Sequence, residues 1–383
     1  MKKILYITTT AGFLPQFELN DAKMIQEMGY VVHYATNFHN PVYAFEEKDL
    51  TEQGIILHQI DIEKSPLRVF TNQKAIRQLK KIIDDEQIDI VHCHNPLGGV
   101  AGRIAAHFSK KKPYVIYTAH GLHFYKGAPL LNWMLFYPAE KILARWTDVI
   151  ITINEEDYQR VKSKFRLKGG GYTEKIPGVG IDLDRFKEDR HDREKMREML
   201  KIPQNAFHIV TAAELNKNKN QRVIIEAIGQ LETKDIYYSL CGEGAEEEKL
   251  HKLIERLHLQ ERVRILGFRS DMEKILPTAD VFAFPSIREG LGMAAIEALA
   301  CGVPVIAADN RGAREYIQEG INGVLCAPED VERFRSIIEK MHDDLVYRRR
   351  LADNSRTSVV GFSVKNTTEN MRAIYEKAEQ HIW

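Results

Sequence analysis

The chain alternates between short apolar runs rich in β-branched residues and longer stretches in which apolar residues recur at helical spacing. One series of runs lies at 3–9, 31–37, 89–95, 114–121 and 148–154, and a second lies at 208–215, 236–244, 263–268, 281–286 and 304–310. Such alternation is typical of parallel sheets covered by helices on both faces. The two series therefore predict an α/β protein with two doubly wound, Rossmann-like domains.

The segment between the two series has the composition of a linker. Residues 169–171 are three consecutive glycines, and Pro177, Gly178 and Gly180 follow. We place the boundary near Gly180, which predicts domains at 1–180 and 181–363, and the final predicted helix, at about 364–383, could pack on either. Ligands of open α/β sheets bind beyond the carboxyl ends of the strands, so two such domains facing each other would line one cleft.

Length and composition exclude several classes of protein. The chain has 383 residues, of which 44% are apolar and 28% charged, and 54 Lys and Arg balance 54 Asp and Glu. At about 150 residues per domain, each domain can bury its own core, and neither a disulfide-stapled fold nor disorder fits. Zero net charge gives no reason to expect nucleic acid as a partner. Residues 1–180 carry 23 Lys and Arg against 19 Asp and Glu, and this basic excess fits either an anionic surface or ligand that binds this side, or chance.

The cysteines and the apolar runs favour a cytoplasmic protein. The four cysteines (Cys93, Cys241, Cys301 and Cys326) are widely spaced and lie in or beside apolar segments, as reduced core thiols do. The first residues have too short an apolar run for a signal peptide and are better interpreted as a buried strand. No run of about 18 apolar residues is present, so we expect no membrane span.

The most informative stretch is 279–317, where an apolar strand leads into a loop with Glu289, Gly290 and Gly292 before an Ala-rich helix that begins near Met293. Glycine amides and the helix dipole favour a phosphate at this position. Glu289 and Glu297 would repel phosphate but accept hydrogen bonds from sugar hydroxyls. Together these features indicate a nucleotide sugar, and the alternative is a helix N-terminus stabilised by acidic residues.

The spacing from Glu289 to Glu297, within PSIREGLGMAAIEALACGVPVIA, resembles the E-x7-E signature of family 4 retaining glycosyltransferases of the GT-B fold. The resemblance covers nearly the whole chain. It includes DIVHCHNP, YTAHGLHF, IPGVGIDLDRF, LCGEG and LGFRSDM, in the order that the family shows. Within the family, TAHGLHFYKGAP and ELNKNKNQ are most similar to enzymes of bacterial exopolysaccharide and capsule assembly.

The resemblance implies a set of donor-binding residues. Glu297 would bind the ribose hydroxyls and Glu289 the transferred sugar, while backbone near Phe268 and Arg269 would recognise the base. The amides of Leu291, Gly292 and Met293 would hold the distal phosphate, and the loop with Gly12 would also line the donor site. Lys219 would stabilise the charge that grows on the diphosphate, although a lysine in a turn can also be merely solvated.

The chain departs from the family pattern at one point. The family commonly has Gly-Arg five residues before the lysine, whereas this chain has Ala213 and Glu214. A carboxylate there would repel a diphosphate unless it turns away or pairs with a neighbour. Lys217 or Arg288 could supply the missing cation.

Histidines follow two strands of the first domain. By the resemblance, His120 would lie near the transferred sugar, where its carbonyl or imidazole could stabilise positive charge at the anomeric carbon; the alternative is a structural histidine. His92 and His94 share one strand face, but no third ligand is evident, so we interpret them as packed or cleft-lining and expect no metal site.

Two further segments have competing interpretations. Asp182 and Asp184 form a D-x-D, the metal signature of the other major glycosyltransferase fold, but we interpret them as part of the linker. The segment 123–146 is rich in aromatic residues with basic neighbours, which suits either a membrane surface or a buried helix pair. Its aromatic residues are Phe124, Tyr125, Trp133, Phe136, Tyr137 and Trp146.

These features predict a retaining glycosyltransferase that transfers a hexose from a UDP-linked donor, without cofactor or metal, to a glycan or lipid-linked acceptor in exopolysaccharide or capsule assembly. We expect it in the cytoplasm, with reversible contact to the anionic inner face of the membrane. The alternatives are a nucleotide-sugar epimerase or hydrolase on the same fold, and a non-catalytic sugar-nucleotide-binding subunit.

Overall fold

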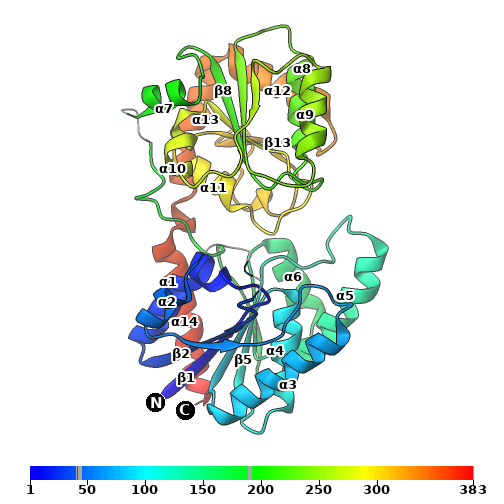
Figure 1. The fold of residues 1–383 in the computed structure, drawn as a ribbon, viewed down its shortest axis with the longest axis vertical. Helices are drawn as coiled ribbons and strands as arrows, with labels where there is room; N and C mark the ends of the chain where they lie inside the picture. The colour runs from blue at the N-terminus through cyan, green and yellow to red at the C-terminus, as the bar shows by residue number, and fades with distance from the viewer. Residues whose placement is uncertain (40, 42–44, 189–191, 383) are drawn as a thin grey trace. The chain divides into compact units, whose positions relative to one another are not determined.

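The computed structural model describes residues 1–39, 41, 45–188 and 192–382, and it divides the chain into two compact units. The first unit comprises Met1–Gly180 with Val364–Trp383, and the second comprises Ile181–Ser363. Each unit contains one parallel sheet with helices on both faces (Figure 1). The predicted α/β class with two Rossmann-like sheets is confirmed.

The sheet of the first unit has the strand order β3-β2-β1-β4-β5-β6-β7. Its strands are β1 (Lys2–Ile7), β2 (Tyr30–Thr36), β3 (Ile56–Gln59), β4 (Ile90–His94), β5 (Tyr114–Ala119), β6 (Val149–Thr152) and β7 (Tyr172–Lys175). The apolar runs predicted the five inner strands. The edge strands β3 and β7 were missed because they are half-buried or exposed along their length and so lack a continuous apolar run.

The helices of the first unit separate onto the two faces of its sheet. Figure 1 shows α1 and α14 on one face and α3 and α4 on the other, and the packing of α1 on α14 and of α3 on α4 agrees with this. The helical segments are η1 (Leu14–Glu18, a π-helix), α1 (Leu19–Glu27), α2 (Glu47–Glu52), α3 (Val69–Asp85), α4 (Pro96–Phe108), α5 (Leu130–Leu143), η2 (Ala144–Trp146), α6 (Glu155–Lys164) and α14 (Val364–Ile382).

The final helix, α14, belongs to the first unit. The hydroxyl of Tyr375 lies 2.7 Å from the hydroxyl of Tyr6 on β1 and 2.7 Å from Nδ1 of His92 on β4. All three side chains are buried, so these hydrogen bonds fasten the helix to the centre of the sheet.

The sheet of the second unit has the strand order β10-β9-β8-β11-β12-β13. Its strands are β8 (Phe207–Ala212), β9 (Ile236–Cys241), β10 (Val263–Ile265), β11 (Val281–Phe284), β12 (Val305–Ala308) and β13 (Gly323–Cys326). Its helical segments are α7 (Arg193–Met199), α8 (Gln221–Gly229), α9 (Glu247–Arg256), α10 (Met272–Ile275), η3 (Leu276–Thr278), α11 (Met293–Ala300), η4 (Ala313–Glu315), α12 (Val331–Asp343), α13 (Leu345–Ser358) and η5 (Val360–Phe362).

Parallel strands bring their carboxyl ends to one edge of each sheet. In the first unit this edge carries the loops that follow β1, β4 and β5, and in the second it carries those that follow β8, β10, β11 and β12. The predicted site residues lie in these loops or in the first turns of the helices that they precede. Throughout the described ranges, no helix combines the length and the hydropathy that crossing a membrane requires.

Candidate active site

The loop after β11 forms an open anion-binding turn. Gly292 caps α11 at φ +101°, and a Cβ there would lie 2.6 Å from the ring of Phe284 and 2.8 Å from the hydroxyl of Tyr316. Only glycine fits this backbone conformation and this space. The amides of Leu291, Gly292 and Met293 donate to no protein acceptor among the described residues. They and the positive end of α11 can therefore receive an anion.

Asparagine side chains hold this loop in place from two sides. Nδ2 of Asn310, after β12, donates to the carbonyl of Ser286 at 2.8 Å. Nδ2 of Asn218, after β8, donates to the carbonyl of Arg288 at 2.9 Å. The loop is thus positioned by the ends of both neighbouring strands, which places Lys219 next to it.

Lys219 and Glu289 meet in this loop. Nζ of Lys219 lies 2.5 Å from Oε1 of Glu289, and the two side chains are only 23% and 13% exposed. The alternative of a merely solvated lysine is therefore wrong. The pair places one cation and one hydroxyl acceptor beside the anion-binding turn.

The carboxylate that departs from the family pattern, Glu214, is exposed to solvent. Its backbone carbonyl accepts a hydrogen bond from Nε2 of Gln221 at 3.0 Å, and within the described ranges its carboxylate forms no ion pair.

A second cation near the anion-binding turn, Arg311, was not predicted from the sequence. It is 7% exposed, and its Nε donates to the carbonyl of Glu289 at 3.3 Å.

Glu297 lies one turn into α11 in a largely buried position. Burial raises the pKa of its carboxyl to about 7, Arg185 opposes the shift, and Glu273 adds to it. Nη2 of Arg185 pairs with Oε2 of Glu273 at 3.0 Å. The role of Arg185 was not predicted, because it follows the D-x-D in the linker and is far from α11 in sequence.

The D-x-D aspartates lie in a turn. Oδ1 of Asp182 accepts hydrogen bonds from the amides of Asp184 at 2.9 Å and Arg185 at 3.0 Å, and both aspartates are exposed. This is a side-chain-capped turn of the kind that the linker interpretation implies.

The residues predicted near the base lie in the loop after β10. Phe268 is 75% exposed, and its amide donates to Oε1 of Glu243 at 3.3 Å. The guanidinium of Arg269 pairs with Asp271, with a shortest distance of 2.7 Å. The backbone amide of Phe268, which was expected near the base, thus donates to a protein side chain in this structure.

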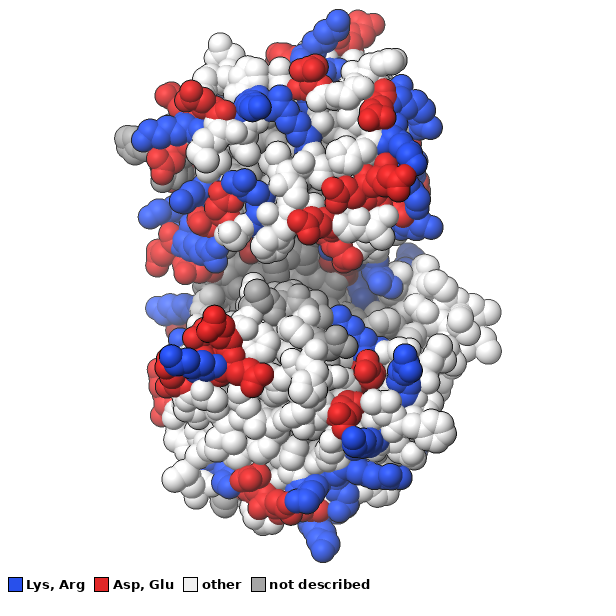
Figure 2. All heavy atoms as spheres, viewed as in Figure 1, with Lys and Arg blue, Asp and Glu red and all other residues white. Residues whose placement is uncertain are grey.

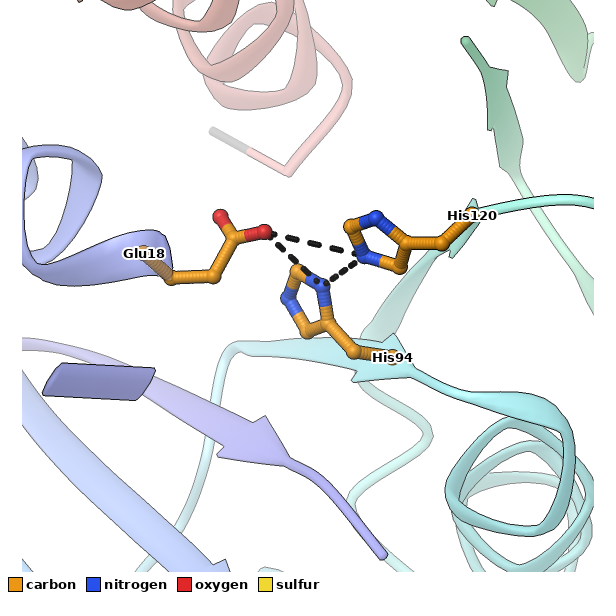
Figure 3. A group of neighbouring side chains, drawn as sticks. All are labelled: Glu18, His94 and His120. Atoms are coloured by element: carbon orange, nitrogen blue, oxygen red, sulfur yellow. Dashed lines mark hydrogen bonds and ion pairs between the residues drawn. The ribbon is translucent and has the colours of Figure 1, made fainter. Parts of the chain in front are cut away.

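In the first unit, the sheet edge brings together three side chains from separate elements, as Figure 3 shows. Glu18 ends η1, His94 ends β4 and His120 follows β5, and Gly12 turns the chain at φ +84° between β1 and η1. Nδ1 of His94 lies 3.2 Å from Nε2 of His120 and 3.4 Å from Oε1 of Glu18. Sequence reasoning missed Glu18, which no motif singles out.

Burial controls the charge of this cluster. It lowers the pKa of His120 to about 4 and that of His94 well below its usual value, so both imidazoles are neutral at pH 7. The same effect raises the pKa of Glu18 well above its usual range. Carboxylate and imidazole atoms within 4.8 Å of one another could also hold a divalent metal ion, a grouping that the expectation of no metal site overlooked.

His92, by contrast, is a packed residue. Its Nδ1 bonds to Tyr375 and its Nε2 lies 2.8 Å from Oγ1 of Thr118, so both ring nitrogens are engaged. The ring nitrogen of His94 therefore pairs with His120 and not with His92.

A pocket of about 370 Å³ lies in the first unit, and its lining includes Asn95 and Gly121, the residues that follow His94 and His120. Pro96 and Leu97 line it from the start of α4, Phe124 and Phe136 line it from the segment around α5, and Lys64 contributes an ammonium group. The lining is mainly apolar, which suits an apolar part of a ligand.

The aromatic side chains of segment 123–146 do not form an exposed surface. Phe124 is fully buried, and Trp133, Phe136 and Tyr137 pack against the core. The aromatic residues therefore support the buried alternative, because their large apolar area stabilises the core. The exposed apolar residues of α5 are aliphatic: Leu130, Leu131, Met134, Leu135 and Ile142 are each more than half exposed.

Comparison with known families gives two matches. Residues 3–154 match the family described as "Glycosyl transferase 4-like", and residues 192–358 match "Glycosyl transferases group 1". Among curated relatives, "Putative glycosyltransferase EpsD" of Bacillus subtilis (strain 168) is 41% identical over 378 residues, covering 98% of this chain and 96% of the relative.

More distant relatives carry more specific names. The "UDP-Gal:alpha-D-GlcNAc-diphosphoundecaprenol alpha-1,3-galactosyltransferase" of Escherichia coli is 26% identical over 315 residues, covering 81% of this chain and 80% of the relative. The structure of Anabaena Alr3699/HepE in complex with UDP-glucose superposes with a TM-score of 0.81 at 21% identity, covering 98% of this chain and 100% of the other. The predicted GT-B fold is thereby confirmed.

Proposed function

The chain belongs to the family 4 glycosyltransferases, and on this premise we propose that it is a retaining hexosyltransferase that uses a UDP-linked sugar. The observation that carries the proposal is the open anion-binding turn at Gly292, flanked by the Lys219–Glu289 pair and by Glu297. One phosphate position with a cation and two hydroxyl acceptors suits a nucleoside diphosphate sugar. UDP is the nucleotide in the HepE complex and in the name of the Escherichia coli relative.

Each donor-site residue then has a role. Glu297 accepts hydrogen bonds from the ribose hydroxyls, Glu289 accepts them from the sugar, and the amides of Gly292 and Met293 hold the distal phosphate. Lys219 lies within 2.5 Å of Glu289, so its ammonium can follow the charge that develops on the diphosphate. These protein charges replace a metal ion at the diphosphate.

The transfer breaks the bond between the anomeric carbon and the distal phosphate oxygen and forms a bond from that carbon to the acceptor oxygen. The acceptor attacks from the face that the phosphate leaves, which retains the configuration. Its hydroxyl proton passes to the departing phosphate, and the backbone carbonyl of His120 stabilises the positive charge of the sugar ring.

We place the acceptor in the first unit, with an apolar part in the pocket beside His120. Leu67 and Phe70, each 88% exposed, follow Pro66 in the chain, and Pro66 lines this pocket together with Phe136 of α5. Leu67, Phe70 and the aliphatic residues of α5 are thus exposed apolar residues of the two segments that contribute Pro66 and Phe136 to the pocket, and we call them the apolar rim. Figure 2 shows that the surface over α5 has few charged side chains.

The rim and the basic residues near it suit reversible contact with an anionic membrane, where a lipid-linked acceptor would be available. Lys126, Lys141 and Arg145 are exposed beside the aliphatic residues of α5. Each basic residue near such a surface contributes about 1 kcal/mol, and salt screens it. A role in exopolysaccharide or capsule assembly follows from a lipid-linked glycan acceptor.

The decisive test supplies radiolabelled UDP-hexoses with a membrane extract as acceptor source. Label transferred to a lipid-extractable or polymeric product, with the anomeric configuration retained, supports the proposal. Consumption of donor in the absence of acceptor would instead indicate an epimerase or hydrolase, and binding without turnover a non-catalytic subunit. A thermal-shift screen identifies the donor first, since a ligand at a hundred times its Kd adds about 2.7 kcal/mol of stability.

Membrane contact is tested separately by co-sedimentation with vesicles. Wild type should pellet with anionic vesicles at low salt and much less at high salt or with neutral vesicles. The double variant L131Q/L135Q should pellet less, whereas Val346→Gln, at an 80% exposed position of the second unit, should behave as wild type. Wild-type protein that stays in the supernatant at low salt would exclude this part of the proposal.

A further inference from the structure

Among the described residues, the imidazole of His120 is in contact with two polar side chains, and both lie on one side of the ring. Its Nε2 lies 3.2 Å from Nδ1 of His94 and 3.7 Å from Oε1 of Glu18, and Nδ1 of His94 lies 3.4 Å from the same oxygen. In Figure 3 the second ring nitrogen of His120 points away from this triangle. A neutral imidazole carries one proton, so the triangle decides whether that second nitrogen is a donor or an acceptor.

The surroundings of His94 determine where its own proton lies. Nε2 of His94 is buried and has no hydrogen-bond partner among the described residues. A buried N–H without an acceptor is rarer and more costly than a lone pair without a donor. The proton of neutral His94 therefore lies on Nδ1, which faces Glu18 and His120.

A second carboxyl, Asp21, determines the state of Glu18. Both carboxyls are buried, and within the described ranges the ion-pair partners of Glu18 are only the two histidines. Burial raises the pKa of Asp21 to about 7 and that of Glu18 well above its usual value, and a hydrogen bond joins the two side chains. In this hydrogen bond Glu18 donates and Asp21 accepts, which leaves Oε1 of Glu18, 3.4 Å from Nδ1 of His94, as an acceptor toward the histidines.

We propose that Glu18 and His94 are positioning residues that hold His120 as the neutral tautomer protonated on Nδ1, so that it presents a hydrogen-bond donor to the substrate. Nδ1–H of His94 donates to Nε2 of His120, with Oε1 of Glu18 as a second acceptor. With its inner nitrogen accepting, His120 carries its proton on the outer nitrogen.

This tautomer determines what His120 can do in the sugar transfer. That role rests on the proposed function. An outward N–H donates to an oxygen atom of the sugar or of the acceptor, but it cannot remove a proton from the attacking hydroxyl. The proton must then go to the departing phosphate. The geometry itself does not depend on the reaction.

The tautomer can be measured directly in the full-length wild-type protein. Histidine-selective 15N labelling with long-range 1H–15N correlation at pH 7.5 distinguishes the two neutral tautomers, and loss of signals in His120→Gln assigns His120. We expect the Nδ1-protonated pattern. Protonation of His120 on Nε2 in the wild type would overturn the proposal, and this measurement needs neither activity nor a positioning variant.

Variants of Glu18 test the positioning role. In Glu18→Gln the amide oxygen can face the histidines while its NH2 group donates to Asp21, as the protonated carboxyl does, so tautomer and kcat should stay close to wild type. In Glu18→Ala we expect mixed tautomers and a kcat about 10- to 100-fold lower, with little change in the KM for the donor. The matched control is Glu27→Gln, whose carboxylate is 71% exposed on the following helix.

Two outcomes separate this proposal from its rivals. If Glu18→Gln loses as much activity as Glu18→Ala, and CoCl2 produces the visible absorption of tetrahedral Co2+ in wild type only, the triangle is a metal site and the proposal is wrong. A wild-type protein with the expected tautomer that transfers no sugar would remove the proposed function and leave the tautomer established.

Discussion

The two units present opposite electrostatic properties at the carboxyl edges of their sheets. In the second unit the central pair, Lys219 and Glu289, is charged and partly exposed, while Glu297 is the exception, because burial raises its pKa to about 7. In the first unit the polar cluster around His120 is buried and its imidazoles are neutral. The second unit is therefore suited to a charged diphosphate, and the first to an uncharged sugar and acceptor.

This difference has a simple physical cause. A partly exposed ion pair retains its charge because water still solvates it, whereas burial removes the solvation of a charged group and shifts its pKa toward the neutral form. Substitutions that remove a charge should therefore lower the rate of transfer most in the second unit. In the first unit, replacing a titratable side chain by an uncharged polar one of similar shape should lower the rate least.

The largest effect is expected for Lys219→Met. If Lys219 is the cation that stabilises the leaving diphosphate, its removal should lower kcat about 10²- to 10³-fold. Lys252→Met is the control, because this exposed lysine of α9 pairs only with Glu248 among the described residues. An initial rate near that of wild type would show that Lys219 is not the charge that the reaction uses, and would attribute this role to Arg311.

Glu289→Ala should affect turnover more than binding. If Glu289 contacts the transferred sugar, kcat should fall about 10- to 100-fold while the affinity for UDP stays near that of wild type. Calorimetric titration with UDP and initial rates measure the two quantities. A large loss of UDP affinity would place Glu289 on the nucleotide instead.

Glu297→Ala should lower the affinity for UDP about 10-fold or more, because hydrogen bonds to a charged group contribute about 1.5–3 kcal/mol. Burial raises the pKa of Glu297 to about 7, and the ribose hydroxyls need its charged form as an acceptor. The affinity of wild type for UDP should therefore rise as the pH increases from 6 to 8. Titrations of the variant should show a flatter pH profile, and unchanged UDP affinity in a folded variant would contradict the role.

The same shifted pKa predicts a smaller effect on stability without ligand. A folded pKa of about 7 lies above the unfolded value, so the stability associated with protonated Glu297 is present at low pH and lost as the pH rises through 7. Glu297→Gln should raise Tm by about 2–4 °C at pH 8 and leave it nearly unchanged at pH 5. Equal shifts at both pH values in thermal melts would show that the carboxyl is already charged.

The smallest effect is expected for chelation. If α11 and Lys219 supply the positive charge at the diphosphate, as we propose, excess EDTA should leave the rate unchanged. Loss of activity with EDTA and its recovery with Mn2+ would restore Asp182 and Asp184 as metal ligands. Recovery with Zn2+ alone would point to the Glu18 cluster.

The sequence by itself determined the architecture and the family. Apolar runs at regular intervals reveal buried parallel strands, because such strands are covered on both faces and need continuous apolar side chains. The loop around Glu289 and Gly292 could be identified for a similar reason, since its glycines and carboxylates are close together in sequence. A sequence pattern thus identifies a site when the residues that form it are close together in the chain.

Only the tertiary structure decided which distant residues meet. Glu18, His94 and His120 belong to three chain segments that the parallel sheet brings to one edge, and nothing in their local sequence encodes that contact. Arg185 likewise lowers the pKa of Glu297 from a segment that is distant in sequence. The aromatic residues of α5 face the core and its aliphatic residues face solvent, because the position of the sheet, rather than composition, determines which side of a helix is buried.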